Sequence, residues 1–394
     1  MARKMLAKHP DDLPRLIDFS DPKSFASFTL RERMPRVAAG VAMQPHWPPS
    51  VRSALAALKA TLPCGEVPAV AVSSSQDRDY WEPWLAARSG RRWSELGFLE
   101  AEFVFYRAVF EIVTAAHGPF VDPYAEQKRK DVAKALVTAP RLARDVALVD
   151  RWTLPHVTTA VSAALLGNTA DLSQLVPSRM EAEGRAPLVN DVEAFFAHVT
   201  AEPLVLIDVV LDNAGEELVA DLALVGFLLR SLPQASVRLH AKPYPMFVSD
   251  ATVADVRHAI DELTSSASPE TSAWGRSLSA LEHADRLSIV AEEFWGRPDT
   301  LAEMPVALRQ ALQSATAIVL KGDLNYRRYV GDRSWSPMSP ITSHRVRSLP
   351  PVLSIRVLKS DVVVGLDPEV AEKASLEDPE WLHNGRYSIV QYFR

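Results

Sequence analysis

Two aspartates and an asparagine stand where the ligands of a metal ion could gather. Asp212 and Asn213 directly follow the apolar run LVLIDVVL at 204–211, and Asp250 follows the next strand-like segment and a turn with two prolines. Carboxylate and amide oxygens suit a hard divalent cation such as Mg²⁺ or Mn²⁺, which keeps water on its open positions. Such a cation offsets charge on phosphoryl oxygens and orients or activates water. These residues therefore favour metal-dependent phosphate chemistry.

Two later strand-like runs also end in charged residues. ATAIVL at 315–320 leads into Lys321, Gly322 and Asp323, and PVLSIRVL at 351–358 leads into Lys359. In open α/β sheets, ligands bind outside the carboxyl ends of the strands. We therefore expect five residues to converge although they are far apart in sequence: Asp212, Asn213, Asp250, Asp323 and Lys359.

Cations and helix ends are expected to hold the phosphate. We expect Lys359, together with Lys321 and Arg327, to contact it from the side opposite the metal. Backbone donors at the helix starts at 214–217 and 251–253 would add to them.

Each of these residues also has a structural interpretation. Asp250, with Ser249, stands at the N-cap position of a predicted helix, and Asn213 could cap the helix before it. The two strand-end lysines could be ordinary solvated charges, and Asp323 could serve only its Gly-Asp turn. Spacing alone leaves these alternatives open.

The elements that must position these residues alternate between strand and helix. The run at 204–211 is almost continuously apolar, as is typical of a strand buried on both faces of a parallel sheet. A helical stripe follows at 215–230, then an alternating strand at 236–242 and a helix at 251–263. SSASPETSAWG at 265–275 is interpreted as a polar loop. The order indicates an α/β unit with a parallel sheet.

The first part of the chain is predicted to be mainly helical. Segments at 50–62 and 98–116 carry apolar residues at three- and four-residue spacing. LVPSRMEAEGRAPLVN at 175–190 mixes proline, glycine and charge, which is typical of a connection. We predict a mainly helical N-terminal domain at 1–185 and an α/β metal-binding catalytic domain at 186–394, sizes that suit a chain of 394 residues.

Composition excludes several other functions. A formal net charge of −6 disfavours a nucleic-acid partner, and the single cysteine, Cys64, excludes an internal disulfide and cysteine-rich metal centres. The longest apolar helix-like run, Leu218 to Leu229, is too short for a membrane span and contains Asp221. The N-terminus has no stretch typical of a secretory signal, so we expect a cytoplasmic protein without a membrane partner. No Walker loop, GxGxxG, HExxH or GxSxG motif occurs.

Four segments carry a resemblance to a known family. They are LDNAGEELVADLALVGFLL (211–229), KPYPMFVSD (242–250), KGDLNYRRYVGDRSW (321–335) and RVLKSDVVVGL (356–366). Weaker similarity covers RERMP (31–35), EFVFYR (102–107), DPYAEQK (122–128), LLGNTADLS (165–173) and GRYSIVQYF (385–393). The chain resembles the damage-control phosphatase family, formerly a domain of unknown function. Within it, the chain is most similar to subfamily III, which includes the acidic-residue methyltransferase-like proteins.

The resemblance implies a fold, an activity and a site. The fold is a mainly helical N-terminal domain on a three-layer Rossmann-like α/β domain. The activity is hydrolysis of small phosphorylated metabolites, such as fructose 1-phosphate or fructose 6-phosphate, with Mn²⁺, Mg²⁺, Co²⁺ or Ni²⁺. Metal ligation and catalysis would fall to Asp212, Asn213 and Asp250. The implied substrate-binding residues are Glu217, Asp323, Asn325, Arg327 and Lys359.

One position departs from the family signature, and two other functions compete. The subfamily signature is Arg-Thr-x-Lys, whereas this chain reads Arg356-Val357-Leu358-Lys359, so a hydroxyl is missing and substrate preference is open. One alternative is S-adenosylmethionine-dependent methylation of protein carboxylates. It usually requires a glycine-rich turn after the first strand, where this chain has Asp-Asn-Ala-Gly. The other alternative, a non-catalytic metabolite-binding protein, would require a broken ligand set.

Overall fold

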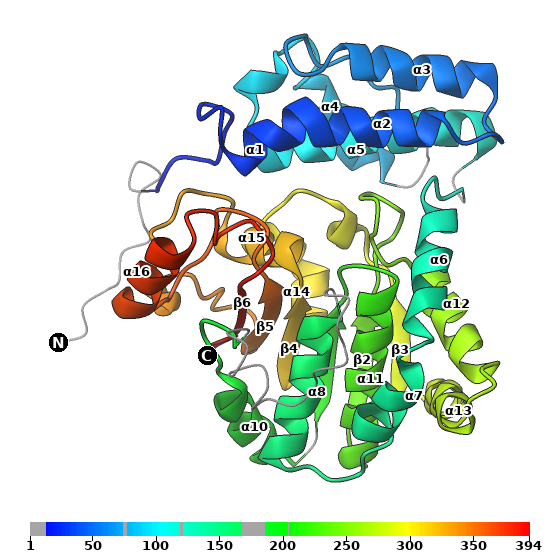
Figure 1. Cartoon of the computed structure of the whole chain (residues 1–394), viewed down its shortest axis with the longest axis vertical. Helices are drawn as coiled ribbons and strands as arrows, with labels where there is room; N and C mark the ends of the chain where they lie inside the picture. Colours follow the sequence, from blue (N-terminus) through cyan, green and yellow to red (C-terminus); the bar gives the residue numbers. More distant parts are fainter. Residues whose placement is uncertain (1–12, 74–76, 119–120, 168–185, 204) are drawn as a thin grey trace.

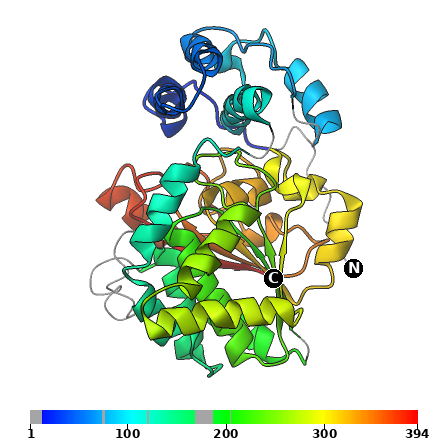
Figure 2. The same cartoon turned by 90° about the vertical axis from the view of Figure 1, so that its right-hand side faces the viewer.

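The computed structural model describes residues 13–73, 77–118, 121–167, 186–203 and 205–394. Helices of the N-terminal part form a layer above one end of an α/β unit (Figure 1), and a view turned by 90° shows the same two-part arrangement (Figure 2). Residues of both parts can therefore meet at this end of the α/β unit.

The N-terminal layer has its own apolar core. The two predicted helices are confirmed, because α3 spans Pro49–Ala60 and α5 spans Phe98–His117. Helix α5 is buried on almost every side, and its aromatic residues pack on Trp81 and Trp93. The other elements are α1 (Phe25–Phe28), the π-helix η2 (Thr29–Arg33), α2 (Met34–Ala42), α4 (Arg78–Ala86) and η3 (Trp93–Glu95).

A six-stranded sheet with the order β3-β2-β1-β4-β5-β6 forms the centre of the α/β unit. Its strands are β1 (Leu206–Val210), β2 (Ser236–His240), β3 (Leu287–Val290), β4 (Ala317–Lys321), β5 (Val352–Val357) and β6 (Ser388–Phe393). All neighbours pair in parallel except β5 and β6, which are antiparallel. The strands predicted to end at the site are confirmed.

Helices cover both faces of this sheet, because successive strand residues point to opposite faces. Val209 joins the core under one helical layer and Val210 the core under the other. The first layer holds α6 (Ala125–Ala135), α7 (Ala139–Leu142), η4 (Ala143–Ala147), α8 (Leu154–Leu166), α10 (Val192–Thr200), α11 (Glu216–Ser231), α12 (Val253–Thr264) and α13 (Pro269–His283). The second holds η6 (Glu293–Gly296), η7 (Leu301–Glu303), α14 (Val306–Leu312), α15 (Asp323–Val330) and α16 (Pro368–Glu377), with η8 (Ile341–Ser343) nearby. The predicted three-layer α/β fold is confirmed.

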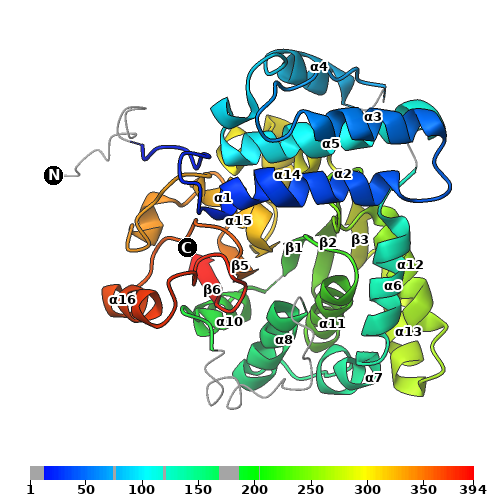
Figure 3. The ribbon, with the colours of Figure 1, turned by 45° about the horizontal axis from the view of Figure 1, so that its top comes forward.

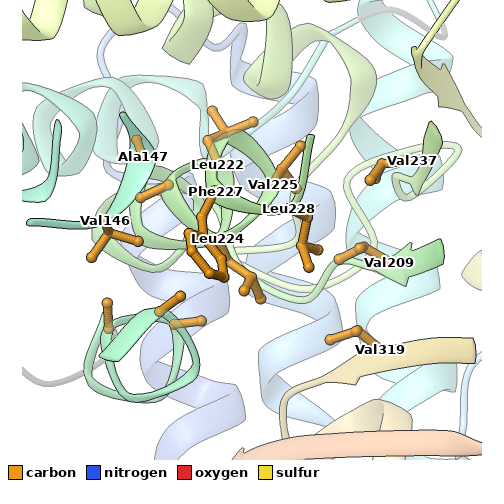
Figure 4. Close-up of a cluster of buried hydrophobic side chains, with 14 of the residues drawn as sticks. Val146, Ala147, Val209, Leu222, Leu224, Val225, Phe227, Leu228, Val237 and Val319 are labelled. Atoms are coloured by element: carbon orange, nitrogen blue, oxygen red, sulfur yellow. The ribbon is translucent and has the colours of Figure 1, made fainter. Parts of the chain in front are cut away.

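Helix α11 is the central support of the first layer. It lies between sheet residues such as Val209 and Val319 on one side and the η4 residues Val146 and Ala147 on the other (Figure 4). Because α11 begins a few residues after β1, this packing fixes the turn that carries the predicted metal ligands.

The cores bear on the predicted domain division. Helices α6 to α8 share a hydrophobic cluster with the sheet, although they precede residue 186. Helices α2 to α5 belong to a different cluster. The boundary at 185–186 stays a prediction, and most of the predicted connection at 175–190 falls outside the described residues.

Three other findings correct or extend the sequence-based predictions. The polar loop expected at 265–275 is wrong, because Ser268 caps α13 and the helix begins at Pro269. Strands β3 and β6 were not predicted. No helix in the described part of the chain is both long and apolar enough to cross a membrane.

Candidate active site

The predicted site lies where the strand order reverses. From β1 the chain builds the sheet outward through β2 and β3, and then resumes on the other side of β1 with β4. At such a reversal the two connections leave in opposite directions and open a crevice at the carboxyl ends of the strands. Asp212 follows β1, and Gly322 and Asp323 follow β4. The two central strands thus deliver their charged ends to one place.

A short antiparallel contact brings the three predicted metal ligands together. The N–H of Ala251 donates to the carbonyl of Asp212 at 2.9 Å, and the N–H of Ala214 donates to that of Ser249 at 2.6 Å. Asn213 and Asp250 are paired as bridge partners between these bonds. The loop after β2 is thereby fixed against the turn after β1, as the sequence-based convergence required.

Neither Asn213 nor Asp250 caps a helix. Helix α12 is capped by Thr252, whose side chain accepts from the N–H of Asp255, and the N-cap of α11 is Gly215. The capping interpretations are therefore wrong. Instead, Asp250 accepts at Oδ2 from the N–H of Phe247 at 3.1 Å, which closes its own loop.

The helix start expected at 251–253 does not serve this site. None of residues 251–253 lines the cavity that contains Asp212. Thr252 and Ala254 instead line a different cavity, with residues of α6. At α11 the expectation holds better, because Ala214, Glu216 and Glu217 line the same cavity as the predicted ligands.

Burial raises the pKa values of the two aspartates. Burial is the largest cause for Asp212, and the Glu217 and Asp250 carboxylates add to it, whereas Lys242 and Lys359 oppose it. Burial likewise raises the pKa of Asp250, against the attraction of Lys242 and the Phe247 N–H. Burial in turn lowers the pKa of the Lys242 ammonium. The nearby protein cations thus do not fully offset these carboxylates, and an added cation would be favoured here.

The amide of Asn213 sits inside a polar network. Its Nδ2 donates to Asp212 Oδ2 at 2.9 Å and to Glu217 Oε2 at 2.8 Å, and its Oδ1 accepts from the Ser249 hydroxyl at 2.5 Å. Glu217 and Asp212 therefore together orient the Asn213 amide.

Lys321 is not placed where the sequence suggested. Its ammonium lies 3.0 Å from Asp221 Oδ1 and 3.6 Å from Glu217 Oε1, and it also donates to the carbonyl of Ala164. It is buried between β4, α8 and α11 and does not line the cavity. The expectation that Lys321 contacts phosphate is wrong, because its place in the strand directs it to the same face as Val319. The Lys321 ammonium instead stabilises the Glu217 carboxylate from the side away from the cavity.

A cavity of about 510 Å³ connects most of the predicted residues. Of the predicted site residues, those lining it are Asp212, Asn213, Glu217, Asp250, Asp323, Arg327 and Lys359. Asn325 does not line it. Its side chain is buried, and Nδ2 donates to the carbonyls of Leu211 at 3.1 Å and Lys321 at 2.8 Å. Asn325 thus ties the ends of β1 and β4 together beneath the cavity floor.

Asp323 fixes the loop that carries Lys359. Its Oδ1 lies 2.8 Å from Arg356 Nη2 and accepts from the Lys359 N–H at 3.2 Å and the Ser360 hydroxyl at 3.1 Å. Burial alone would raise the pKa of Asp323, but Arg356 and Arg327 hold it below its ordinary value. No ion pair or hydrogen bond of the Lys359 ammonium is found among the described residues. It is therefore free to meet an anion in the cavity.

The departure from the signature lies outside the cavity. Val357 belongs to the apolar core under α8 and α10, on the same face of β5 as Leu353 and Ile355. It is not among the residues that line the cavity. The side chain of a threonine at this position would therefore leave the strand on its buried face, as that of Val357 does.

Arg327 lines the cavity with its guanidinium already engaged. It pairs with Asp332 at 2.7 Å and Glu102 at 2.8 Å, and its guanidinium carbon stands 4.5 Å from the centre of the Phe98 ring. These contacts join α15 to α5, so Arg327 holds the N-terminal helices over the sheet edge.

Several cavity residues were not predicted from the sequence. Phe25, Arg33 and Glu102 come from the N-terminal helices, Phe247 comes from the loop before Asp250, and Lys134 comes from α6. Phe247 lies in KPYPMFVSD, one of the four main segments of resemblance, and Arg33 and Glu102 lie in RERMP and EFVFYR, which belong to the weaker resemblance.

The donor set fits a divalent cation. The described residues contain no group of three or more histidine, cysteine, aspartate or glutamate side chains that could hold a metal ion. The predicted set instead offers two buried carboxylates and one amide, and a cation held by them would complete its shell with water and substrate oxygens. That ligand pattern suits Mg²⁺ or Mn²⁺ better than a structural zinc ion.

The fold and site define an α/β protein with an acidic cavity at the topological switch point, roofed by N-terminal helices. The damage-control phosphatase ARMT1-like domain matches residues 29–374, and the chain belongs to this family. The family expected from the sequence motifs is thereby confirmed.

Individual relatives agree with this assignment. Damage-control phosphatase ARMT1 of Rattus norvegicus is 29% identical over 434 residues, covering 96% of this chain and 98% of the relative. The Xenopus tropicalis protein of the same name is 31% identical over 350 residues, covering 80% of this chain and 79% of its own. The Mus musculus protein is 38% identical over 215 residues, and there the match spans only 49% of the relative's length. A crystal structure of a DUF89 family protein from Pyrococcus horikoshii has the same fold, with a TM-score of 0.51, 17% identity, and coverage of 94% of this chain and 98% of that one.

Proposed function

We propose that this protein is a metal-dependent phosphatase of small phosphorylated metabolites, with sugar phosphates such as fructose 1-phosphate or fructose 6-phosphate as substrates. One observation carries the proposal: a single cavity holds the buried carboxylates of Asp212 and Asp250 and the half-buried amide of Asn213 together with the free ammonium of Lys359. Family membership supports it, since the relatives are named damage-control phosphatases.

In this proposal the chain's own residues bind and orient. Asp212, Asn213 and Asp250 hold a divalent cation, Mn²⁺, Mg²⁺, Co²⁺ or Ni²⁺, which when bound supplies charge stabilisation of the phosphoryl oxygens and lowers the pKa of water. Glu217 orients the Asn213 amide through the 2.8 Å hydrogen bond. Lys359 donates to the phosphoryl oxygens, and Asp323 keeps the Lys359 backbone in place.

The shape of the cavity suits a small substrate. A volume of about 510 Å³ is within the usual range of small-molecule sites, and α1, η2 and α5 form part of its wall. Seen from above, α1 and α2 run across the carboxyl-end side of the sheet (Figure 3). This arrangement favours a small substrate over a macromolecule.

The test is a hydrolysis assay of the full chain. Phenyl phosphate and a panel of hexose phosphates are supplied with each of the four metals, and released phosphate is measured. The proposal requires phosphate release that Asp212→Asn abolishes. A parallel assay measures transfer of a labelled methyl group from S-adenosylmethionine to protein carboxylates. Methyl transfer without phosphate release would favour the methyltransferase alternative, and metabolite binding without either reaction would favour the binding-protein alternative.

A further inference from the structure

The N-terminal helices place one unpaired cation in the cavity. Arg33 is the last residue of the π-helix η2, is exposed, and lines the cavity that contains Asp212 and Lys359. No hydrogen bond or ion pair of its guanidinium is found among the described residues. The other charged residues of this helical run, Arg31, Glu32 and Arg36, do not line the cavity, and Arg36 pairs with Glu32 at 2.9 Å.

The local backbone explains why Arg33 points into the cavity. Residues 25–42 form one helical run in which η2 interrupts α1 and α2 with a wider turn. Such a turn inserts an extra residue and rotates the side chains that follow it, and single π-turns of this kind are frequent at functional sites. Leu30 and Met34 remain buried in the core of the N-terminal layer, so the run cannot rotate as a whole.

Arg33 and Lys359 act on different groups of the cavity. The Arg33 charge opposes the rise that burial causes in the pKa values of Glu102 and Tyr106, which belong to α5. Lys359 instead influences Asp212, and its backbone N–H is bound to Asp323. The two free cations therefore serve two parts of one cavity, one provided by the sheet edge and one by the N-terminal helices.

We propose that Arg33 is a substrate-binding residue that donates hydrogen bonds to oxygen atoms in the organic part of a phosphorylated metabolite, while Lys359 binds its phosphate. The proposal rests on the phosphatase function proposed above and deepens it. It makes the N-terminal helices a source of substrate selectivity. A guanidinium presents several donors in one plane, which suits hydroxyl, carbonyl or carboxylate oxygens.

The test compares substrates with and without such oxygens. Phenyl phosphate has a phosphate but no hydroxyl, carbonyl or carboxylate oxygen in its organic part, whereas a hexose phosphate has several. We expect Arg33→Ala to lower kcat/KM for the best hexose phosphate of the panel by about 10- to 100-fold, the scale of a lost charged hydrogen bond, chiefly through KM. The value for phenyl phosphate should change less than about twofold, and Arg33→Lys should recover part of the loss.

Arg31 provides the matched control. It is exposed, belongs to the same π-helix, and does not line the cavity, so Arg31→Ala should leave both substrates unaffected. An equal loss for both substrates in Arg33→Ala, or no loss for either, would overturn the proposal while leaving the phosphatase function intact. Hydrolysis of phenyl phosphate but of no hexose phosphate by the wild type would have the same meaning. If the wild type hydrolyses neither class with any metal, the phosphatase function fails, and this proposal fails with it.

Discussion

Gly322 holds Asp212 in position by leaving room for it. The glycine N-caps α15 with φ of 80° and ψ of 173°, a backbone conformation that is almost restricted to glycine. A Cβ added here would stand 2.6 Å from the Cβ of Asp212 and overlap its carboxylate. Gly322→Ala therefore strains the backbone and also pushes Asp212 away.

The two effects have different sizes and different readouts. Backbone strain should lower the free energy of unfolding by about 1–3 kcal/mol. To restore ordinary contact at 3.4 Å, the Cβ of Asp212 must shift by about 0.8 Å, the difference from 2.6 Å, and its carboxylate must shift further, because Oδ2 would stand still closer to the added Cβ. Because a misplacement of about 1 Å can cost on the order of 100-fold in rate, we expect kcat/KM for phenyl phosphate to fall by about that factor.

Gly118 separates strain from displacement. It has φ of 89° and ψ of 170°, nearly the same conformation, and no atom of the described residues would lie within 4 Å of its added Cβ. Gly118→Ala should therefore lose similar stability in chemical denaturation but keep wild-type kcat/KM and Mn²⁺ affinity. If Gly322→Ala also kept wild-type activity and affinity, the placement of Asp212 at the site would be refuted.

Three further outcomes follow from the site. Asp250→Asn should abolish turnover without lowering the metal-free melting temperature, because Asn can still accept a hydrogen bond from the Phe247 N–H and Thr252 caps the helix. Near wild-type turnover at saturating metal would show that Asp250 has only a structural role. Lys359→Ala should lower kcat/KM by an amount that corresponds to about 2–3 kcal/mol of lost transition-state binding. Metal affinity should change little, since the backbone bond of residue 359 to Asp323 remains. Equal protection of the wild type and the variant by inorganic phosphate in thermal melts would place Lys359 outside the site. Burial raises the pKa of Asp221 from 3.8 to about 7, so the folded protein retains a proton that the unfolded chain has lost. Unfolding free energy should then fall as pH rises from about 4 to about 7, and Asp221→Asn should flatten this fall; denaturation curves of equal pH dependence would contradict that cause.

The parts of the site built by the sheet could be predicted from local sequence. Buried parallel strands leave continuous apolar runs, and their carboxyl ends share one edge, so the convergence of Asp212, Asp250 and Lys359 followed from strand recognition alone. The direction of the Lys321 side chain could also be predicted from the sequence. It is two residues after Val319, so strand alternation places both on the α11 face.

Other elements gave weaker or misleading signals. Strand β6 contains Gln391, a polar residue that would not be expected in a buried strand, yet its side chain is satisfied by the carbonyl of Val364 and the hydroxyl of Tyr326. The polar composition of the run before Trp274 favours a loop, although Ser268 followed by Pro269 is a frequent helix start. A polar composition alone does not distinguish a loop from a helix with one buried side.

The contribution of the N-terminal helices could not be derived from local patterns. The apolar composition of α5 predicts that this helix is buried, but not how the N-terminal layer sits on the sheet edge. That placement depends on contacts across a large sequence separation, such as the pairing of Glu102 with Arg327 at 2.8 Å. Arg33 and Glu102 therefore became candidates only in three dimensions.

The most direct test of the account is a titration of Mn²⁺ into the metal-free full chain by calorimetry, with phenyl phosphate hydrolysis measured along the same titration. We expect binding at a single site, and activity that is absent with a chelator and rises with the same half-saturation. Asp250→Asn should lose both, whereas Asp131→Asn, which alters a carboxylate on the rim of the same cavity, should keep both. Full hydrolysis in chelated buffer, or unchanged metal binding by Asp250→Asn, would contradict a metal site formed by Asp212, Asn213 and Asp250.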